Sequence, residues 1–267
     1  MFKIRKLSPG ALSLLLATAS AAPTAHAAND NPWGLQFFVG DSAGTEGDFA
    51  SHRTTQVPDL GVFDPALSGT SGNAAFNSLR YDDIYRSRYV LGAEVSYDAS
   101  ENLEAYGRFS YNPLDGQTHT IGLLTTSDQS VSEPITAHFK DADQYSLMLG
   151  SRYYVPTGDQ WRVFAGAALG ASRFDDMTGT IDLPTAGVSM PDLRFARATT
   201  VFSQSLEAGI AYHSPASVDL QFSIGADHMD GPKGGDDATL AALGFDTTRD
   251  GGDRWSFPIT LGATYRF

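Results

Sequence analysis

The last thirteen residues of the chain, from Trp255 to Phe267, alternate between two kinds of side chain. Every odd-numbered residue is apolar or aromatic, and every even-numbered residue is polar, small or proline. Successive side chains of a β-strand point to opposite faces, so this segment predicts a strand with one apolar and one polar face. Aromatic residues lie near both ends of the apolar row, where a strand that crosses a bilayer meets its two interfaces. The pattern is typical of a lipid-facing β-strand.

The same two-residue period recurs in seven earlier segments, although Tyr106 and Phe164 fall on the otherwise polar face and the first segment is short and less regular. These segments are 33–39, 89–97, 103–112, 144–155, 161–172, 205–212 and 218–227. Three connections between them are short and rich in turn-forming residues, at 98–102, 156–160 and 213–217. The other four are long, at about 41–84, 113–143, 175–197 and 229–253. The sequence therefore predicts eight strands whose connections alternate between short and long.

Backbone N–H and C=O groups find no hydrogen-bond partner in hydrocarbon, so strands in a bilayer must close into a barrel without a free edge. An even strand count, with both chain ends on the short-turn side, is the pattern of bacterial outer-membrane barrels. The predicted fold is therefore all-β, an eight-stranded antiparallel up-and-down transmembrane β-barrel with short periplasmic turns and long extracellular loops. A soluble sandwich or a secreted barrel would also alternate, with its apolar face inside. The aromatic belts, the unequal loops and the terminal aromatic residue favour membrane insertion.

The N-terminal segment has the features of a secretory signal peptide. Lys3, Arg5 and Lys6 precede an apolar stretch at 11–22 that is too short to span a bilayer, and Ala25-His26-Ala27 matches a cleavage site. We expect residues 1–27 to be a cleaved signal peptide and residues 28–267 to be the outer-membrane barrel domain, exported across the inner membrane of a bacterium.

Charge and composition exclude several classes of protein. The chain has 18 Lys and Arg against 31 Asp and Glu, a net charge of −13, which argues against a nucleic-acid partner. Removal of the signal peptide, with its three basic residues, leaves about −16. The chain has no cysteine, so disulfides, thiolate metal sites and a cysteine nucleophile are excluded.

The export signal, the eight amphipathic segments and the ending Leu261-x-Ala263-x-Tyr265-Arg266-Phe267 resemble the OmpA/OmpX-type (opacity/porin-like) outer-membrane β-barrel superfamily of Gram-negative bacteria. The resemblance covers the whole mature chain and implies that Ala263, Tyr265 and Phe267 form the signal that the outer-membrane assembly machinery recognises. It is architectural and says little about activity. No peptidoglycan-binding domain follows Phe267, so we do not expect a role in cell-wall tethering.

An eight-stranded barrel is just wide enough for side chains to fill its interior. The inward-facing positions carry charges of both signs, which are costly in a closed lumen unless they pair. The predicted network comprises Arg88, Glu94, Glu104, Arg108, Arg152, Arg162, Glu207, Asp219, Asp227 and Arg266. We expect these ion pairs to plug the lumen and the protein to have a structural or adhesin-like surface-interaction role. The alternative is a narrow channel for small solutes or ions.

A lipid-modifying enzyme is a second alternative. Some small barrels of this membrane use a His-x-Ser pair, and none of the histidines here has Ser two residues later. His213 precedes Ser214 at a predicted turn, and His228 with Asp230 near the extracellular rim lacks a nucleophile placed by spacing. We therefore predict no catalysis and no cofactor.

The long loops carry much of the acidity, including Asp236, Asp237, Asp246, Asp250 and Asp253 among several glycines. These carboxylates either bind a divalent cation or form solvated turns, and their spacing does not match a calcium loop. Residues 118–124 with 135–139, and 180–183 with 193–196, are expected to prolong hairpins above the membrane, and 238–243 to form one or two helical turns. The expected partners are outer-membrane lipid and lipopolysaccharide, the assembly machinery and an extracellular ligand of the loops, and the expected state is a monomer.

Overall fold

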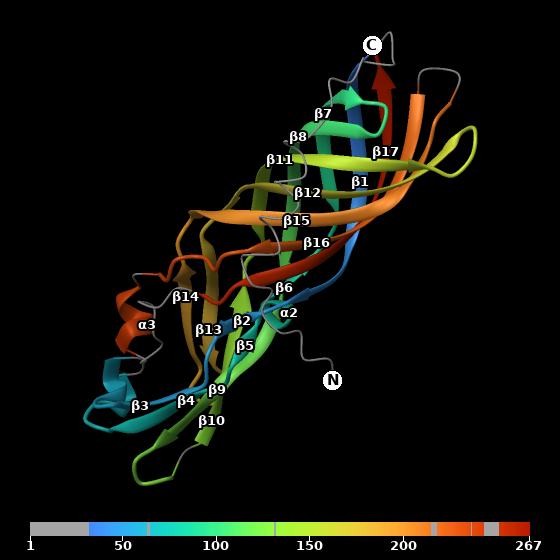
Figure 1. Ribbon diagram of the computed structural model, residues 1–267. Helices are drawn as coiled ribbons and strands as arrows, with labels where there is room; N and C mark the ends of the chain where they lie inside the picture. The colour runs from blue at the N-terminus through green and yellow to red at the C-terminus, as the bar shows by residue number, and fades with distance from the viewer. Residues whose placement is uncertain (1–31, 63–64, 131, 215–217, 236, 243–250) are drawn as a thin grey trace.

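The computed structural model describes residues 32–267 except 63–64, 131, 215–217, 236 and 243–250. Eight long antiparallel strands form a closed barrel in the order in which they follow along the chain, and the last pairs with the first (Figure 1). They are β1 (Trp33–Glu46), β7 (Val90–Ser100), β8 (Leu103–Gly116), β11 (Ala142–Pro156), β12 (Trp161–Phe174), β15 (Thr199–Tyr212), β16 (Val218–Met229) and β17 (Arg254–Arg266). The predicted eight-stranded up-and-down barrel is confirmed.

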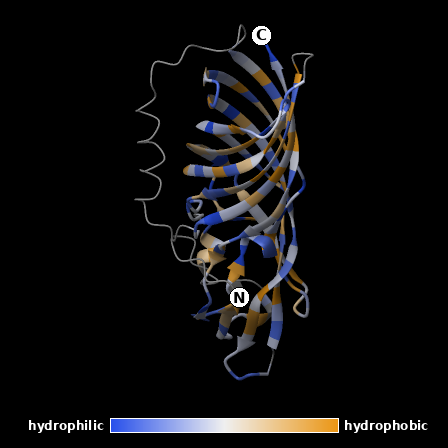
Figure 2. Cartoon of the chain, turned by 45° about the vertical axis from the view of Figure 1, so that its right-hand side comes forward, coloured by the Kyte–Doolittle hydropathy of each residue, from blue (hydrophilic) through white to orange (hydrophobic). Residues whose placement is uncertain are grey.

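The two faces of the barrel strands are those that the alternation predicts. On β11 the side chains of Leu147 and Leu149 are 62% and 71% exposed, whereas Arg152 is 1% exposed. Patches of opposite hydropathy follow one another along the barrel strands in Figure 2. Apolar side chains thus cover the outside of the barrel, and polar and charged side chains fill its lumen. Such an exterior is stable only in contact with an apolar solvent.

Inward-facing glycines make room for the bulky side chains of the lumen. A Cβ atom on Gly209 would lie 2.6 Å from the ring of Phe164, and one on Gly92 would lie 2.1 Å from the ring of Phe38. The aromatic residues that interrupt the polar inner face, including Phe164, are therefore accommodated by a small residue on a neighbouring strand.

The four long connections are not plain loops, and they form more structure than the hairpins expected from the sequence. The first three contribute a six-stranded antiparallel sheet at one end of the barrel, opposite the C-terminus (Figure 1). Its strands, in sheet order, are β14 (Val188–Ala196), β13 (Met177–Leu183), β10 (Ser132–Phe139), β9 (Thr118–Thr126), β4 (Gly72–Phe76) and β3 (Arg53–Val57). Four short elements join this sheet to the barrel: β2 (Asp48–Ala50), β5 (Leu79–Arg80), α2 (Tyr81–Ile84) and β6 (Tyr85–Ser87). Two 3₁₀ turns (Leu60–Val62, Pro65–Leu67) lie in the connection between β3 and β4. We call these four connections together the cap.

The cap has a hydrophobic core of its own. Leu60, Ile121, Ile135 and Ile181 are completely buried in it, together with Tyr81, Phe174 and Met229 at the junction with the barrel. The hairpins foreseen at 118–139 and 180–196 are present as β9–β10 and β13–β14. The two hairpins are merged into one sheet by pairing of β10 with β13, and pairing of β4 with β9 adds the strands of the first connection.

The predicted helical turn at 238–243 is present as α3 (Ala238–Ala242), while residue 243 lies outside the described residues. The carboxylate of Asp237 accepts hydrogen bonds from the backbone amides of Thr239 and Leu240, as an N-cap does. Leu240 is buried in the cap core. The helix therefore belongs to the cap rather than to a free loop.

The predicted signal peptide at 1–27 lies outside the described residues and stays a prediction. Within the described part of the chain, no helix has the length and apolar character needed to cross a membrane.

Candidate functional site: the charged lumen of the barrel

The guanidinium group of Arg152 on β11 lies at the centre of the lumen and binds three carboxylates. Its Nη1 lies 2.8 Å from Glu104 Oε1, its Nε lies 2.7 Å from Glu207 Oε1, and its Nη2 lies 2.7 Å from Glu94 Oε2. The three glutamates come from β7, β8 and β15, so one arginine links four strands of the wall. All four side chains are almost fully buried. Direct pairing is what makes such charges tolerable in a closed interior.

Arg108 on β8 extends this network towards the cap. Its Nε donates to Glu94 Oε2 at 2.8 Å, and its Nη2 donates to Glu207 Oε2 at 2.9 Å. The ring of Tyr106 lies 4.1 Å from the guanidinium carbon of Arg152, and its hydroxyl donates to Glu207. The ring of Tyr106 thus holds the plane of the Arg152 guanidinium group by a cation–π contact.

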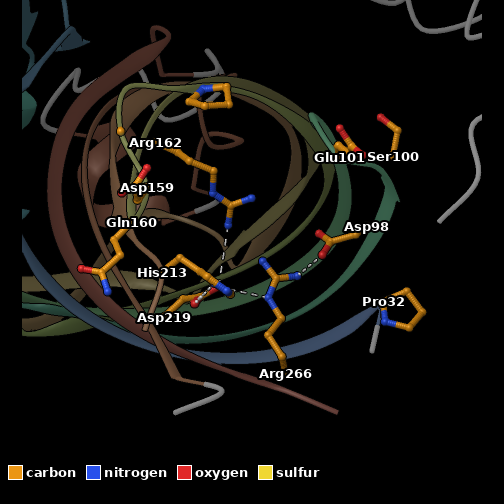
Figure 3. A pocket seen from close by; sticks show the side chains of 12 residues that line it. Pro32, Asp98, Ser100, Glu101, Asp159, Gln160, Arg162, His213, Asp219 and Arg266 are labelled. Atoms are coloured by element: carbon orange, nitrogen blue, oxygen red, sulfur yellow. Dashed lines mark hydrogen bonds and ion pairs between the residues drawn. The ribbon is translucent and has the colours of Figure 1, made fainter. Parts of the chain in front are cut away.

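A second ionic cluster closes the lumen at the end where the chain terminates (Figure 3). Arg266 on β17 contacts Asp98 at 2.8 Å, Glu104 at 3.1 Å and Asp219 at 3.2 Å. His213 Nδ1 lies 2.7 Å from Asp219 Oδ1. Because Glu104 binds both Arg152 and Arg266, the two clusters form one continuous network that fills the cross-section of the barrel.

The structure brings together eight of the ten residues predicted for this network. They are Glu94, Glu104, Arg108, Arg152, Arg162, Glu207, Asp219 and Arg266. Asp227 faces the lumen but stands apart from the network, in a cavity nearer the cap. The placement of Arg88 in the lumen is wrong. It precedes β7, its side chain is 54% exposed, and it pairs with Asp115 at the rim, because the alternation of β7 begins only at Val90.

The structure adds lumen residues that the sequence argument missed. Asp98 and His213 were assigned to turns, yet both contact the network. Tyr154 shares the inward parity of Arg152 and donates to Glu104. Arg254, at the start of β17, is 3% exposed and donates to Gln144 beneath the cap core. Parity along the strands signals Tyr154 and Arg254, but no local pattern shows that turn residues fold back over the lumen.

Two cavities flank the network. A chamber of about 60 Å³ lies between the network and the cap and is lined by polar side chains, including Ser172, Ser203, Ser205 and Asp227. A recess of about 320 Å³ opens at the other end of the barrel and is lined by the short turns, by Pro32 and by Arg266 (Figure 3). The ion pairs separate the two cavities.

His228 and His138 lie outside both cavities, and each is paired with an aspartate. His228 contacts Asp253 at 3.5 Å and Trp255, not the Asp230 partner considered from the sequence. On the cap, His138 Nδ1 lies 2.7 Å from the hydroxyl of Thr118, and its Nε2 lies 2.9 Å from Asp182. Neither cavity includes these cap residues. A hydroxyl, an imidazole and a carboxylate in contact form a catalytic unit only beside a binding site and oxyanion donors. Here these side-chain contacts link β9, β10 and β13 of the cap sheet.

The acidic cluster of the last long connection is only partly described, since residues 236, 246 and 250 fall outside the described residues. Asp237 caps α3, and Asp253 contacts His228. In the described part of the chain, no three His, Asp or Glu side chains gather as a metal site would require.

The C-terminal residues Ala263, Tyr265 and Phe267 lie on the outer face of β17. Tyr265 and Phe267 are 56% and 55% exposed, and their rings stack at 6.3 Å. The side chains of the predicted assembly signal are therefore accessible from outside the barrel.

The apolar exterior and the ion-paired lumen together define a membrane-spanning β-barrel, the class that occurs in bacterial outer membranes. No family model and no characterised protein matches the sequence. Among solved structures, the chain is similar to Neisserial surface protein A (NspA) at 12% identity, with a TM-score of 0.41 over 88% of this chain and 97% of that one. It is similar to the attachment invasion locus protein Ail of Yersinia pestis at 12% identity, with a TM-score of 0.37 over 90% and 100% of the two chains. It is also similar to the outer membrane protein OprG of Pseudomonas aeruginosa at 13% identity, with a TM-score of 0.46 over 92% and 99%. At these values no residue role is transferred.

Proposed function

We propose that this protein is an outer-membrane barrel that displays a folded cap at the cell surface for interaction with other molecules, with an adhesin-like role. The observation that carries the proposal is the hydrophobic core of the cap. A core fixes the backbone of the cap in one arrangement, so its surface is organised before a partner arrives. Preorganisation of this kind lowers the entropy cost of recognition.

The charge of the cap indicates the chemistry of the partner. Residues 41–84, 113–143, 175–197 and 229–253 carry 22 of the 31 acidic residues of the chain and 7 of the 18 basic ones, so the cap is strongly acidic. A cationic protein surface or peptide is therefore favoured over an anionic one, and its association with the cap is expected to weaken as salt is added.

The absence of cysteine from the sequence allows a direct test of this orientation. Thr125 lies on a cap strand, and Gly158 lies in the short turn between β11 and β12. A membrane-impermeant maleimide is expected to label Thr125→Cys in intact cells, and Gly158→Cys only after the outer membrane is permeabilised. The reverse pattern would show that the cap faces the periplasm and would end the proposal.

A narrow channel is the rival function, because a polar chamber lies above the ion pairs. Arg152 and its three carboxylates occupy the path between the chamber and the recess, which favours a closed lumen. We expect the refolded protein to give no discrete conductance steps in a planar bilayer. Reproducible steps would favour the channel and count against the plug.

The remaining proposals concern partners and catalysis. We propose that lipid and lipopolysaccharide surround the apolar exterior, that the assembly machinery recognises Ala263, Tyr265 and Phe267, and that the barrel is a monomer without enzymatic activity.

Phe267→Ala is expected to reduce the amount of folded protein in the membrane, measured by the heat-modifiable gel shift. A shift in the mass of lipid A on overexpression would contradict the absence of catalysis.

A further inference from the structure

The recess at the terminal end of the barrel is a closed-ended polar site (Figure 3). Its floor is the Arg266–Asp219–Asp98 cluster, and its walls come from the β7–β8 turn and the β11–β12 turn. A volume of about 320 Å³ is at the small end of the range for ligand pockets in proteins. The recess can therefore hold a small molecule that does not pass through the barrel.

Arg162 points into this recess with hydrogen-bond donors that no described residue engages (Figure 3). Its guanidinium carbon lies 4.7 Å from the ring centre of Tyr154, which holds the plane of the group. Its Nη2 lies 3.8 Å from Asp219 Oδ2, beyond hydrogen-bond distance, and its buried Nε has no hydrogen-bond partner among the residues that the structure describes. Asp219 is already engaged by His213 and Arg266. A carboxylate in the recess would meet the terminal Nη1 and Nη2 of this planar group, which can bind it in a bidentate manner.

The charge of the recess is not that of a simple anion site. Four carboxylates line it, those of Asp98, Glu101, Asp159 and Asp219, against the guanidinium groups of Arg162 and Arg266. Asp98 and Asp219 pair with Arg266, whereas Glu101 and Asp159 are exposed turn residues without an ion pair in the described part of the chain. In the view of Figure 3, Asp159 and Glu101 lie on opposite sides, with the guanidinium group of Arg162 between them. A ligand with only a negative charge would be repelled by the carboxylates of Glu101 and Asp159. A ligand with only a positive charge would offer no acceptor to the guanidinium group of Arg162.

We propose that the recess binds a small zwitterion, a molecule that carries both a carboxylate and an ammonium group, such as a dipeptide with free ends. Arg162 binds the carboxylate in a bidentate manner. Glu101 binds the ammonium group from across the recess, and the charge of Asp159 adds to the attraction. The ion-paired floor stops the ligand from entering the lumen, so the site is a receptor-like pocket and not a channel entrance.

The test compares three ligands on the refolded full-length barrel in detergent micelles by calorimetric titration. Alanyl-alanine with free ends is expected to bind. N-acetyl-alanyl-alanine, which lacks the ammonium group, and alanyl-alanine amide, which lacks the carboxylate, are each expected to bind at least about tenfold more weakly. Equal affinity of the three ligands, or no binding of alanyl-alanine, would overturn the proposal, and neither result would affect the proposed role of the cap.

Substitutions at the recess, with a control at the opposite rim, locate the site. Arg162→Gln is expected to weaken binding of alanyl-alanine at least about tenfold, while Arg88→Gln, which removes an exposed arginine at the opposite rim, leaves it unchanged. The double variant Glu101→Gln, Asp159→Asn is expected to reduce the preference for alanyl-alanine over its N-acetyl form. The heat-modifiable gel shift identifies variants that fold. Unchanged binding by folded Arg162→Gln would contradict the assignment, and the comparison of ligands on the unaltered protein decides the case if a variant fails to fold.

Discussion

The barrel and the cap are built from strands with the same two-residue period, yet they bury opposite kinds of side chain. In the barrel, Arg152 is 1% exposed and Leu149 is 71% exposed. In the cap, Ile121 is fully buried, and the polar Asn73 and Thr125 lie on the surface side of β4 and β9. The strand geometry is common to both regions, so the solvent around each determines which face is turned inward.

This contrast also concerns how each region is held together. The cap is stabilised as water-soluble proteins are, by removal of apolar surface from water. The barrel has hydrocarbon outside, so its interior relies on ion pairs and on the backbone ladder. Matched substitutions in the two regions should therefore change the free energy of unfolding in opposite directions or by very different amounts.

The largest effect is expected at the centre of the lumen. Arg152→Met leaves Glu94, Glu104 and Glu207 buried without their shared cation, which costs about 3–5 kcal/mol of unfolding free energy. Urea-induced unfolding in detergent, followed by the gel shift, measures the change. Arg88→Met removes an exposed arginine and is expected to change stability by less than about 1 kcal/mol. Equal effects of the two substitutions would show that the network does not hold the barrel.

A loss of core volume should affect the cap and spare the barrel. Ile121→Ala opens a cavity in the fully buried cap core and is expected to cost about 3 kcal/mol of cap stability. Hydrogen exchange should rise in β4, β9 and β10, while the amides of β11 and β12 stay protected. If β11 and β12 lose protection as well, the cap and barrel unfold as a single unit and the comparison fails.

A charge placed on the outward face distinguishes the two solvents. Leu149→Arg on the barrel exterior is expected to cost about 2–4 kcal/mol in a bilayer. Leu123→Arg on the outer face of the cap, at a leucine that is 45% exposed, is expected to change stability by about 0.5 kcal/mol or less. Unfolding titrations in lipid vesicles measure both. A similar cost at the two positions would indicate that both faces have the same surroundings.

The smallest effect concerns a buried carboxyl group of the cap. Burial raises the pKa of Glu133, although the backbone amide of Ala186 partly offsets this by hydrogen bonding to the carboxylate. A raised pKa in the folded state means that its stabilising contribution is present below the unfolded pKa and is lost as the pH rises through the folded one. Glu133→Gln should thus stabilise the cap at neutral pH, by about 1 kcal/mol or less, and flatten its pH dependence. Hydrogen exchange at two pH values measures this, and a destabilised cap at pH 7 would contradict it.

The sequence predicted the barrel better than the cap because barrel pairing is local. Each barrel strand pairs with the next one along the chain, so the alternation and the turns suffice to place Glu94 opposite Arg108. The cap depends on pairing between different connections, such as Ala74 with Leu124, which no local period reveals. Arg88 was misplaced for a related reason. Apolar alternation continued through Tyr89 in the sequence, whereas the ladder of β7 begins at Val90.

The central claim is that lipid contacts the odd-numbered side chains of β11 while the even-numbered ones fill the lumen, and spin labelling at single introduced cysteines tests it directly. Labels at 147 and 149 are expected to collide frequently with dissolved oxygen, which concentrates in the bilayer, and labels at 146 and 148 to be shielded from oxygen and from a water-soluble nickel complex. High oxygen accessibility at 146 and 148, with 147 and 149 shielded, would contradict the account.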